Sequence, residues 1–258
     1  MYFRGANNTL AHFKYLNDNF NLFQSNEIII TGTSAGGLAS FVWSNYVYEH
    51  ASHPEGVTIV PDSGTFILDF PSFYNDKTMI DYSAAGLKIS NEQTPMPVKE
   101  CVQRYPTQAE CFQSGNLYEF IKPKMFVIQS QYDLWGLQQI LQLRCLQGST
   151  PASMAKCTDA EKAYIEKYRS RINEAISNIT SVEKHGAWSV SCIQHGFLEN
   201  GRYYENSKYR IPTDSGVEVN DALLAFMRGG EKLYIDSVSW PSNSGCSGVS
   251  QPEKYLLR

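Results

Sequence analysis

A short β-branched run leads directly into a glycine–serine turn, and this junction constrains the possible folds more than any other feature of the chain. Residues 27–31 read Glu-Ile-Ile-Ile-Thr, between turn residues on one side and glycine on the other, which is typical of a buried strand in a parallel sheet. Residues 32–37 read Gly-Thr-Ser-Ala-Gly-Gly, and residues 38–48 suit a helix. The sequence therefore predicts strand, tight turn and helix in immediate succession.

The turn has the pattern Gly32-x-Ser34-x-Gly36 of a nucleophile elbow. In such an elbow the serine occupies a strained turn, and we expect the glycines two positions before and after it to prevent clashes between the flanks of the turn. The pattern is short and arises by chance, so a glycine-rich turn with a solvated serine remains an alternative. A phosphate-binding loop is set aside because the Lys-Ser/Thr ending of a P-loop is missing.

The rest of the chain alternates in the same way between strand-like and helix-like segments. Strands are expected at 57–60, 125–129 and 187–191, and helices at 10–23, from 137 to 143, at 158–177 and at 220–227. The helix at 158 opens with a capping box, Thr158 and Glu161. No repeat or linker divides the chain, and residues 237–251 suit a Ser/Gly-rich loop or tail. This alternation predicts one α/β domain over residues 1–258, with a mostly parallel sheet flanked by helices.

An elbow serine needs an imidazole to take its proton and a carboxylate to orient that imidazole. In this type of fold the partners follow in the order Ser, Asp/Glu, His, each beyond the carboxyl end of a later strand. Asp133 and His195 stand at such positions, and the other four histidines, at 12, 50, 53 and 185, do not. We therefore predict that Ser34, Asp133 and His195 form a catalytic triad. A helix cap at Asp133 and a polar loop residue at His195 are the plainer interpretations.

Composition excludes several other classes of protein. The formal net charge is −4 and no basic run stands out, so we expect no nucleic-acid partner. The longest apolar stretches have only a few residues, whereas a bilayer-spanning helix needs about 20, so we expect no membrane span.

The six cysteines indicate an oxidising compartment. They are dispersed, without a C-x-x-C pair or a Cys/His cluster at zinc-binding spacing, so we expect disulfides and no metal site. Two glycosylation sequons, at Asn7 and Asn178, favour the same compartment. The first six residues contain no apolar segment of a signal peptide. Six cysteines allow fifteen pairings, and spacing alone does not choose among them.

Beyond the elbow, six segments resemble the pectin acetylesterase and Notum-like carboxylesterase family of the α/β-hydrolase class. In chain order they are Phe3-Arg4-Gly5-Ala6, Gly32-Thr33-Ser34-Ala35-Gly36-Gly37, Asp62-Ser63-Gly64-x-Phe66, Tyr132-Asp133-x-Trp135, Cys157-Thr158 and Ser191-Cys192-x-x-His195. The resemblance covers nearly the whole chain.

The resemblance implies a secreted or lumenal serine esterase without a cofactor, expected to be a monomer, that removes acetyl groups from a pectin-like polysaccharide or cleaves another acyl ester. It implies the same triad, with the N–H of Ala35 as one oxyanion-hole donor. Together with spacing it favours three disulfides, Cys101–Cys111, Cys145–Cys157 and Cys192–Cys246. A Notum-like deacylase of proteins or lipids is the alternative substrate class.

The chain also departs from the family pattern. Thr33 stands where plant members commonly have Cys. The family's second oxyanion donor comes from a Gly-Gly-Gly-Trp loop, and the 33 residues before Ser34 contain no such run. We therefore expect an N-terminally incomplete domain that lacks the first strands, with a non-catalytic binding homologue as the rival interpretation. Trp43, Trp135 and Trp188 are candidates for stacking on a sugar, although core positions are the plainer expectation.

Overall fold

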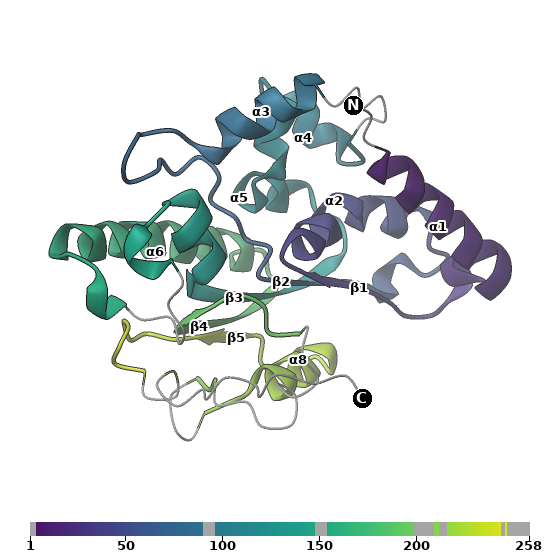
Figure 1. Ribbon diagram of the computed structural model, residues 1–258. Helices are drawn as coiled ribbons and strands as arrows, with labels where there is room; N and C mark the ends of the chain where they lie inside the picture. Colours follow the sequence, from purple (N-terminus) through teal and green to yellow (C-terminus); the bar gives the residue numbers. More distant parts are fainter. Residues whose placement is uncertain are drawn as a thin grey trace, which may run out of the picture.

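The computed structural model describes residues 4–89, 96–147, 154–198, 209–211, 216–243 and 246. Within this part of the chain, five parallel strands form one sheet in the order β1-β2-β3-β4-β5 (Figure 1). The strands are β1 Ile28–Thr33, β2 Val57–Asp62, β3 Lys124–Asp133, β4 Gly186–Gln194 and β5 Leu233–Ile235. Since all five run in the same direction, their carboxyl ends meet at one edge of the sheet, where the sequence analysis places Ser34, Asp133 and His195.

Helices cover both faces of the sheet. They are α1 Gly5–Phe20, α2 Ala35–His50, α3 Met79–Ile89, α4 Lys99–Arg104, α5 Ser114–Leu117, α6 Asp159–Thr180 and α8 Val219–Met227. Figure 1 shows α2, α5 and α6 on one side of the sheet, with α3 and α4 beyond them, and α8 on the opposite side. This three-layer arrangement is the predicted α/β fold.

Side chains from the two faces of the central strands pack into two different hydrophobic clusters. Ile59, Met125 and Val127 belong to the cluster beneath α5 and α6, whereas their neighbours Val60 and Phe126 belong to the cluster beneath α8. Successive side chains of a strand point to opposite faces, so a strand covered by helices on both sides is apolar at nearly every position. This is why these strands are continuous apolar runs in the sequence.

The predicted elements are present, but several boundaries and burial patterns differ. All four predicted strands extend two to four residues beyond their predicted carboxyl ends, because the ladder continues past the apolar runs. The added residues are 32–33, 61–62, 130–133 and 192–194. The segment after Asp133 forms only a short π-helical turn, Gly136–Ile140. The predicted stripe from Leu10 to Phe23 is only partly packed: α1 has no buried residue, and Leu16 and Phe20 are exposed. Phe23 is buried, but it lies in a separate 3₁₀ turn.

Some elements carry no clear sequence signal. Helices α3, α4 and α5 and the strand β5 were not predicted. α4, α5 and β5 have six residues or fewer, which is too few to establish a period, whereas α3 has 11 residues and was missed. Of the expected loop or tail at 237–251, residues 244–245 and 247–251 lie outside the described residues. The capping box of α6 is confirmed: Thr158 Oγ1 accepts from the Glu161 N–H, and the Glu161 carboxylate accepts from the Thr158 N–H.

All six cysteines are paired, as Cys101–Cys111, Cys145–Cys157 and Cys192–Cys246. The third bond joins two cysteines that are 54 positions apart in sequence. It ties Cys246, the last described residue, to Cys192 of β4, three positions before His195. Among the helices in the described ranges, none is both long and apolar enough to cross a membrane.

Candidate active site

Ser34 stands at the junction of β1 and α2 in a backbone conformation that L-residues rarely adopt. Its φ is 61° and its ψ is −122°. The turn is tight enough that a Cβ on Gly32 would come within 2.6 Å of the backbone of Gly36. Backbone strain of this kind costs on the order of 1–3 kcal/mol and persists only where its surroundings enforce it. The local structure is that of the predicted elbow.

The glycine requirement of the elbow differs from the expected one. A Cβ on Gly36 would meet no atom within 4 Å, so there is space for a side chain two positions after the serine. The constrained position is Gly37, where a Cβ would lie 2.5 Å from the carbonyl oxygen of Asp62. The close approach of α2 to the end of β2 therefore explains the second glycine of the Gly36-Gly37 pair.

Three side chains from three strand ends form a continuous hydrogen-bonded chain. Ser34 Oγ lies 2.7 Å from His195 Nε2, and His195 Nδ1 lies 2.7 Å from Asp133 Oδ2. The Asp133 side chain is 3% exposed and that of His195 is 17% exposed, so the carboxylate is shielded while the imidazole is reachable from solvent. The structure thus brings together the three residues that the sequence analysis selected.

Asp133 is itself oriented by two neighbours. The Gly136 N–H donates to its Oδ1 at 2.8 Å, and Gln129 Nε2 donates to its Oδ2 at 3.3 Å. A Cβ on Gly136 would lie 2.4 Å from the hydroxyl oxygen of Tyr168, so a larger residue there would have to displace this buried ring. Burial, and after it the negative charge of Asp133, raises the pKa of Tyr168 well above its usual value, so this phenol stays neutral. The carboxylate is held with Oδ2 directed at His195.

Aromatic rings line one side of His195. Trp135 is half-buried, with its ring centroid 6.4 Å from that of His195, and Phe66 lies at the same centroid distance. The two rings contact each other edge to face at 4.9 Å. Trp188 is fully buried and Trp43 is 8% exposed, so both are core residues. Trp135 is the one predicted stacking tryptophan that lies beside the site.

Ala35 opens α2 directly after Ser34. The first N–H groups of a helix have no acceptor within the helix, and the helix dipole makes this end favourable for negative charge. Ala35 is also exposed. Its position is therefore suited to donate to an oxyanion that forms at the serine.

The other histidines lie elsewhere, in agreement with their exclusion. His12 and His50 are exposed on α1 and α2, His53 is exposed after α2, and His185 is fully buried directly before β4. The sequence analysis gave no role to Asp62, which the structure places at the site: it is fully buried and accepts hydrogen bonds beside both Ser34 and His195. The signal that could have found it is its place just after a strand, which also identified Asp133.

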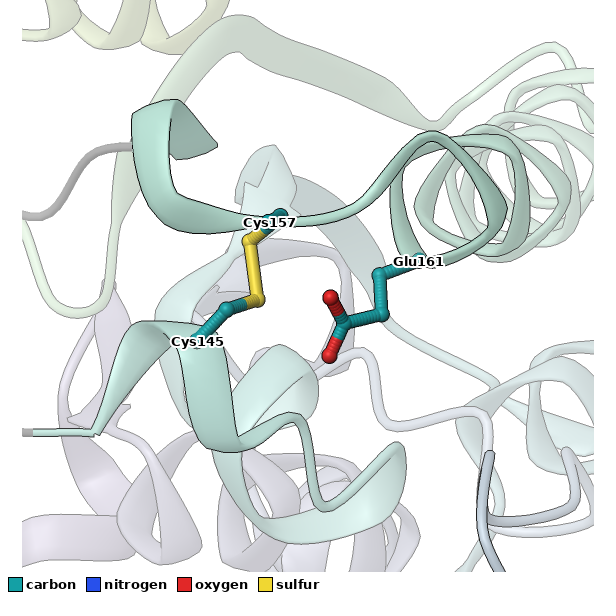
Figure 2. Close-up of side chains that lie close together, drawn as sticks. All are labelled: Cys145, Cys157 and Glu161. Carbon is teal, nitrogen blue, oxygen red and sulfur yellow. A yellow bond between two sulfur atoms is a disulfide. The ribbon is translucent and has the colours of Figure 1, made fainter.

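One cluster has the composition of a metal site but not its chemistry. Figure 2 shows Cys145, Cys157 and Glu161 close together. Their ligand-type atoms all lie within 4.8 Å of one another. The two sulfurs form a disulfide, and a thiolate, not a disulfide sulfur, is the metal ligand. Burial raises the pKa of Glu161, but hydrogen bonds from Thr158 and Tyr74 outweigh it and hold that pKa below its usual value. Glu161 is therefore fully used as a helix cap.

Comparisons with known proteins find a family model, individual relatives and solved structures that this chain resembles. A family model described as Pectinacetylesterase matches residues 1–247. Pectin acetylesterase 5 of Arabidopsis thaliana is 26% identical over 176 residues, which cover 66% of this chain and 40% of that protein. Palmitoleoyl-protein carboxylesterase notum2 of Xenopus laevis is 22% identical over 246 residues, covering 88% of this chain and 47% of the relative.

The fold is also that of a solved structure, the Wnt deacylase Notum from Drosophila. The TM-score is 0.71 at 21% identity, and the alignment covers 95% of this chain and 66% of the Notum chain. The chain spans about half the length of the curated relatives it matches, from 40% to 57%.

Proposed function

Because the chain belongs to the pectinacetylesterase family, we propose that it is a serine carboxylesterase with Ser34 as nucleophile, His195 as general base and acid, and Asp133 as the residue that orients His195. The observation that carries this proposal is the chain of two 2.7 Å contacts from Ser34 through His195 to Asp133. A serine, an imidazole and a shielded carboxylate in this order are the groups that acyl transfer needs.

We propose that the proton moves along these two contacts. Ser34 Oγ attacks the ester carbonyl carbon while its proton passes to His195 Nε2, and the imidazolium then gives that proton to the leaving alcohol oxygen. Water next attacks the acyl-serine, His195 takes one of its protons, and the proton returns to Ser34 as the carboxylic acid leaves. Asp133 Oδ2 accepts from Nδ1–H throughout, which keeps Nε2 free to act as the base.

The negative oxygen of the tetrahedral intermediate is assigned to the N–H of Ala35. In the family pattern the second donor comes from a glycine-rich loop, and residues 1–258 contain no Gly-Gly-Gly-Trp run. Loss of one such donor lowers turnover by about 10²- to 10³-fold in a well-studied protease. We therefore propose slow hydrolysis by this chain when it is measured alone.

As substrate we propose an acetyl ester of a pectin-like polysaccharide. The family match over residues 1–247 supports this class, and the half-buried ring of Trp135 beside His195 supplies an aromatic surface on which a sugar ring can stack.

Cleavage of a long acyl chain from a protein or lipid is the second candidate. It is favoured by the similarity to notum2, a palmitoleoyl-protein carboxylesterase, over 88% of this chain, and by the apolar side that Phe66 adds to the site. The two candidates share the triad and differ in the size of the acyl pocket.

The test compares acetate release from acetylated pectin, and hydrolysis of p-nitrophenyl acetate and p-nitrophenyl palmitate, for the wild-type chain and Ser34→Ala. We expect acetyl-ester hydrolysis by the wild type and only the buffer rate for Ser34→Ala. Ser170→Ala, at an exposed position of α6, is the control and retains activity. Preference for palmitate supports the second candidate, and polysaccharide binding without hydrolysis of any ester contradicts the enzyme proposal.

For localisation we propose a secreted or lumenal protein. All six cysteines are in disulfides, and Asn178 of the second sequon is exposed near the end of α6.

A further inference from the structure

Asp62 lies at the end of β2 with no exposed surface, and its carboxylate gathers donors from two separate parts of the active site. Its Oδ2 accepts from Thr33 Oγ1 at 2.9 Å, from the Phe197 N–H at 2.8 Å and from the Leu198 N–H at 2.8 Å. Thr33 directly precedes the proposed nucleophile, and residues 197–198 follow the proposed base. One oxygen atom therefore joins the elbow to the segment that carries His195.

Backbone and hydroxyl groups of residues 62 and 63 extend the same connection. The carbonyl oxygen of Asp62 accepts from the Ser34 N–H at 2.9 Å. Ser63 Oγ donates to Asp62 Oδ1 at 3.0 Å and accepts from the Gly196 N–H at 2.9 Å. Thus Thr33, which precedes Ser34, is hydrogen-bonded to Asp62, and Gly196, which follows His195, is hydrogen-bonded to Ser63.

The topology of the sheet explains why such a connection matters. Ser34 follows β1 and His195 follows the end of β4, and two strands lie between β1 and β4 in the sheet. No ladder hydrogen bond joins those two strands directly, so their relative position depends on what lies between them. Asp62 pairs in register with Thr33 of β1 and also reaches residues 197–198 beyond β4.

We propose that Asp62, with Ser63, is a positioning residue for the esterase reaction: it sets the placement of Ser34 against His195 by holding Thr33 and residues 196–198 together. This inference rests on the proposed function. Attack requires reacting groups at near-contact distance, and a misplacement of about 1 Å costs on the order of 10²-fold in rate. Asp62 acts through Thr33 and the His195 segment and takes no part in proton transfer itself.

Substitution of Thr33 tests this connection without removing the buried Asp62 carboxylate, and substitution of Thr31 is the matched control. Both lie on β1, and each hydroxyl donates to an acceptor on β2: Thr33 to the Asp62 carboxylate at 2.9 Å and Thr31 to the Val60 carbonyl oxygen at 2.8 Å. Thr→Val removes the hydroxyl at nearly constant volume at either position. Only Thr33 leads to the His195 segment.

The first measurement is therefore the steady-state kinetics of p-nitrophenyl acetate hydrolysis. We expect Thr33→Val to lower kcat by about 10-fold, and by no more than about 10²-fold, with little change in KM, because the substrate-binding surface is untouched. Thr33→Ser restores the hydroxyl and should restore kcat to within about twofold. Thr31→Val should stay within about twofold of wild type. Equal kcat for the two valine variants contradicts the inference.

The second measurement does not depend on activity. A hydrogen bond from His195 Nδ1 to Asp133 gives a low-field imidazole proton resonance, which we expect to shift or broaden in Asp62→Asn. A neutral amide oxygen accepts more weakly than the carboxylate from Thr33 and residues 197–198, and the NH2 group replaces the oxygen to which Ser63 Oγ donates, so that this hydroxyl has to turn. The same resonance should be unchanged in Thr31→Val. An Asp62→Asn protein that folds and keeps the wild-type resonance contradicts the inference.

These results separate the inference from the proposed function. If Asp62→Asn does not fold, the kinetics of Thr33→Val decide the inference alone. If the wild-type chain hydrolyses no ester, the proposed function fails, and the resonance of His195 in Thr33→Val and Thr31→Val then decides whether Asp62 positions that histidine. An unchanged resonance in Thr33→Val overturns the inference in that case.

Discussion

The hydroxyl oxygen of Ser34 lies 2.7 Å from Nε2 of His195, although 161 positions of sequence separate the two residues. The contact forms because both residues follow parallel strands, whose carboxyl ends meet at one edge of the sheet. Ligand and catalytic sites of open α/β sheets lie at this edge for the same reason. The fold thus converts a long separation in sequence into a hydrogen bond.

Asp133→Asn should lower kcat by about 10⁴-fold while leaving the fold intact, because an amide does not hold the imidazole in the tautomer that leaves Nε2 free as a base. Steady-state hydrolysis of p-nitrophenyl acetate measures the loss. Asp81→Asn, at an exposed position of α3, is the control. A decrease of less than 10-fold for Asp133→Asn would show that another group orients His195.

Gly32→Ala and Gly36→Ala should affect stability in opposite directions, although both change a glycine of the elbow. A Cβ at position 32 would lie 2.6 Å from the Gly36 backbone, so we expect the free energy of unfolding to fall by about 1–3 kcal/mol. A Cβ at position 36 meets open space in α2, and alanine there should raise the free energy of unfolding by about 0.5–1 kcal/mol. Urea denaturation of the two variants provides the measurement, and equal destabilisation would contradict the geometry of the elbow.

His185 should make the protein less stable in mild acid. It is fully buried, and neither ring nitrogen has a hydrogen-bond partner in the part of the chain that the structure describes. Burial, and after it the positive charges of Lys184 and Lys232, lowers the pKa of His185 from 6.5 to about 4. The unfolded chain therefore takes up a proton as the pH falls through 6.5, whereas the folded protein does so only near pH 4.

The neutral state of His185 contributes fully to the free energy of unfolding above pH 6.5. This contribution, about 3 kcal/mol, is lost as the pH falls from 6.5 to 4. In His185→Phe, the free energy of unfolding should fall less than in the wild type between pH 7 and pH 4.5. His12→Gln, at an exposed position of α1, should keep the wild-type slope. Parallel slopes for wild type and His185→Phe would rule out the shifted titration.

Removing the Cys192–Cys246 bond should lower both stability and activity. The bond closes a separation of 54 residues, and the chain-entropy account assigns it about 4 kcal/mol. Because Cys192 lies three positions before His195, the double change to Ser should also reduce kcat. The double change at Cys101 and Cys111, whose separation is 10, serves as the comparison and should cost about 3 kcal/mol without a loss of kcat. If the two double variants change kcat equally, the Cys192–Cys246 bond has no specific effect on the active site.

The sequence by itself determined the elements whose signal is local and repeated. A β-branched run between turn residues is enough to identify β1 as a strand. The prediction that this strand is buried was wrong: among the described residues β1 lies at the edge of the sheet, and Ile28 is 6% exposed whereas its neighbour Ile29 is 54% exposed. The glycines around Ser34 identify the turn, and Thr158 with Glu161 identifies the start of α6, because each depends on groups a few residues apart. Order along the chain then selected Asp133 and His195 from the available carboxylates and histidines.

Only the tertiary structure decided which groups touch. Asp62 has the same sequence context as Asp133, at the end of a buried strand, and yet Asp133 meets His195 whereas Asp62 binds the residues on either side of the Ser34–His195 contact. The sequence stripe on α1 likewise did not reveal that Leu16 and Phe20 are exposed. Periodicity records which side of an element is apolar, but hydrogen bonds and burial depend on distances of a few ångströms between strands that are far apart in the chain, and those distances are set by the packing of the whole sheet.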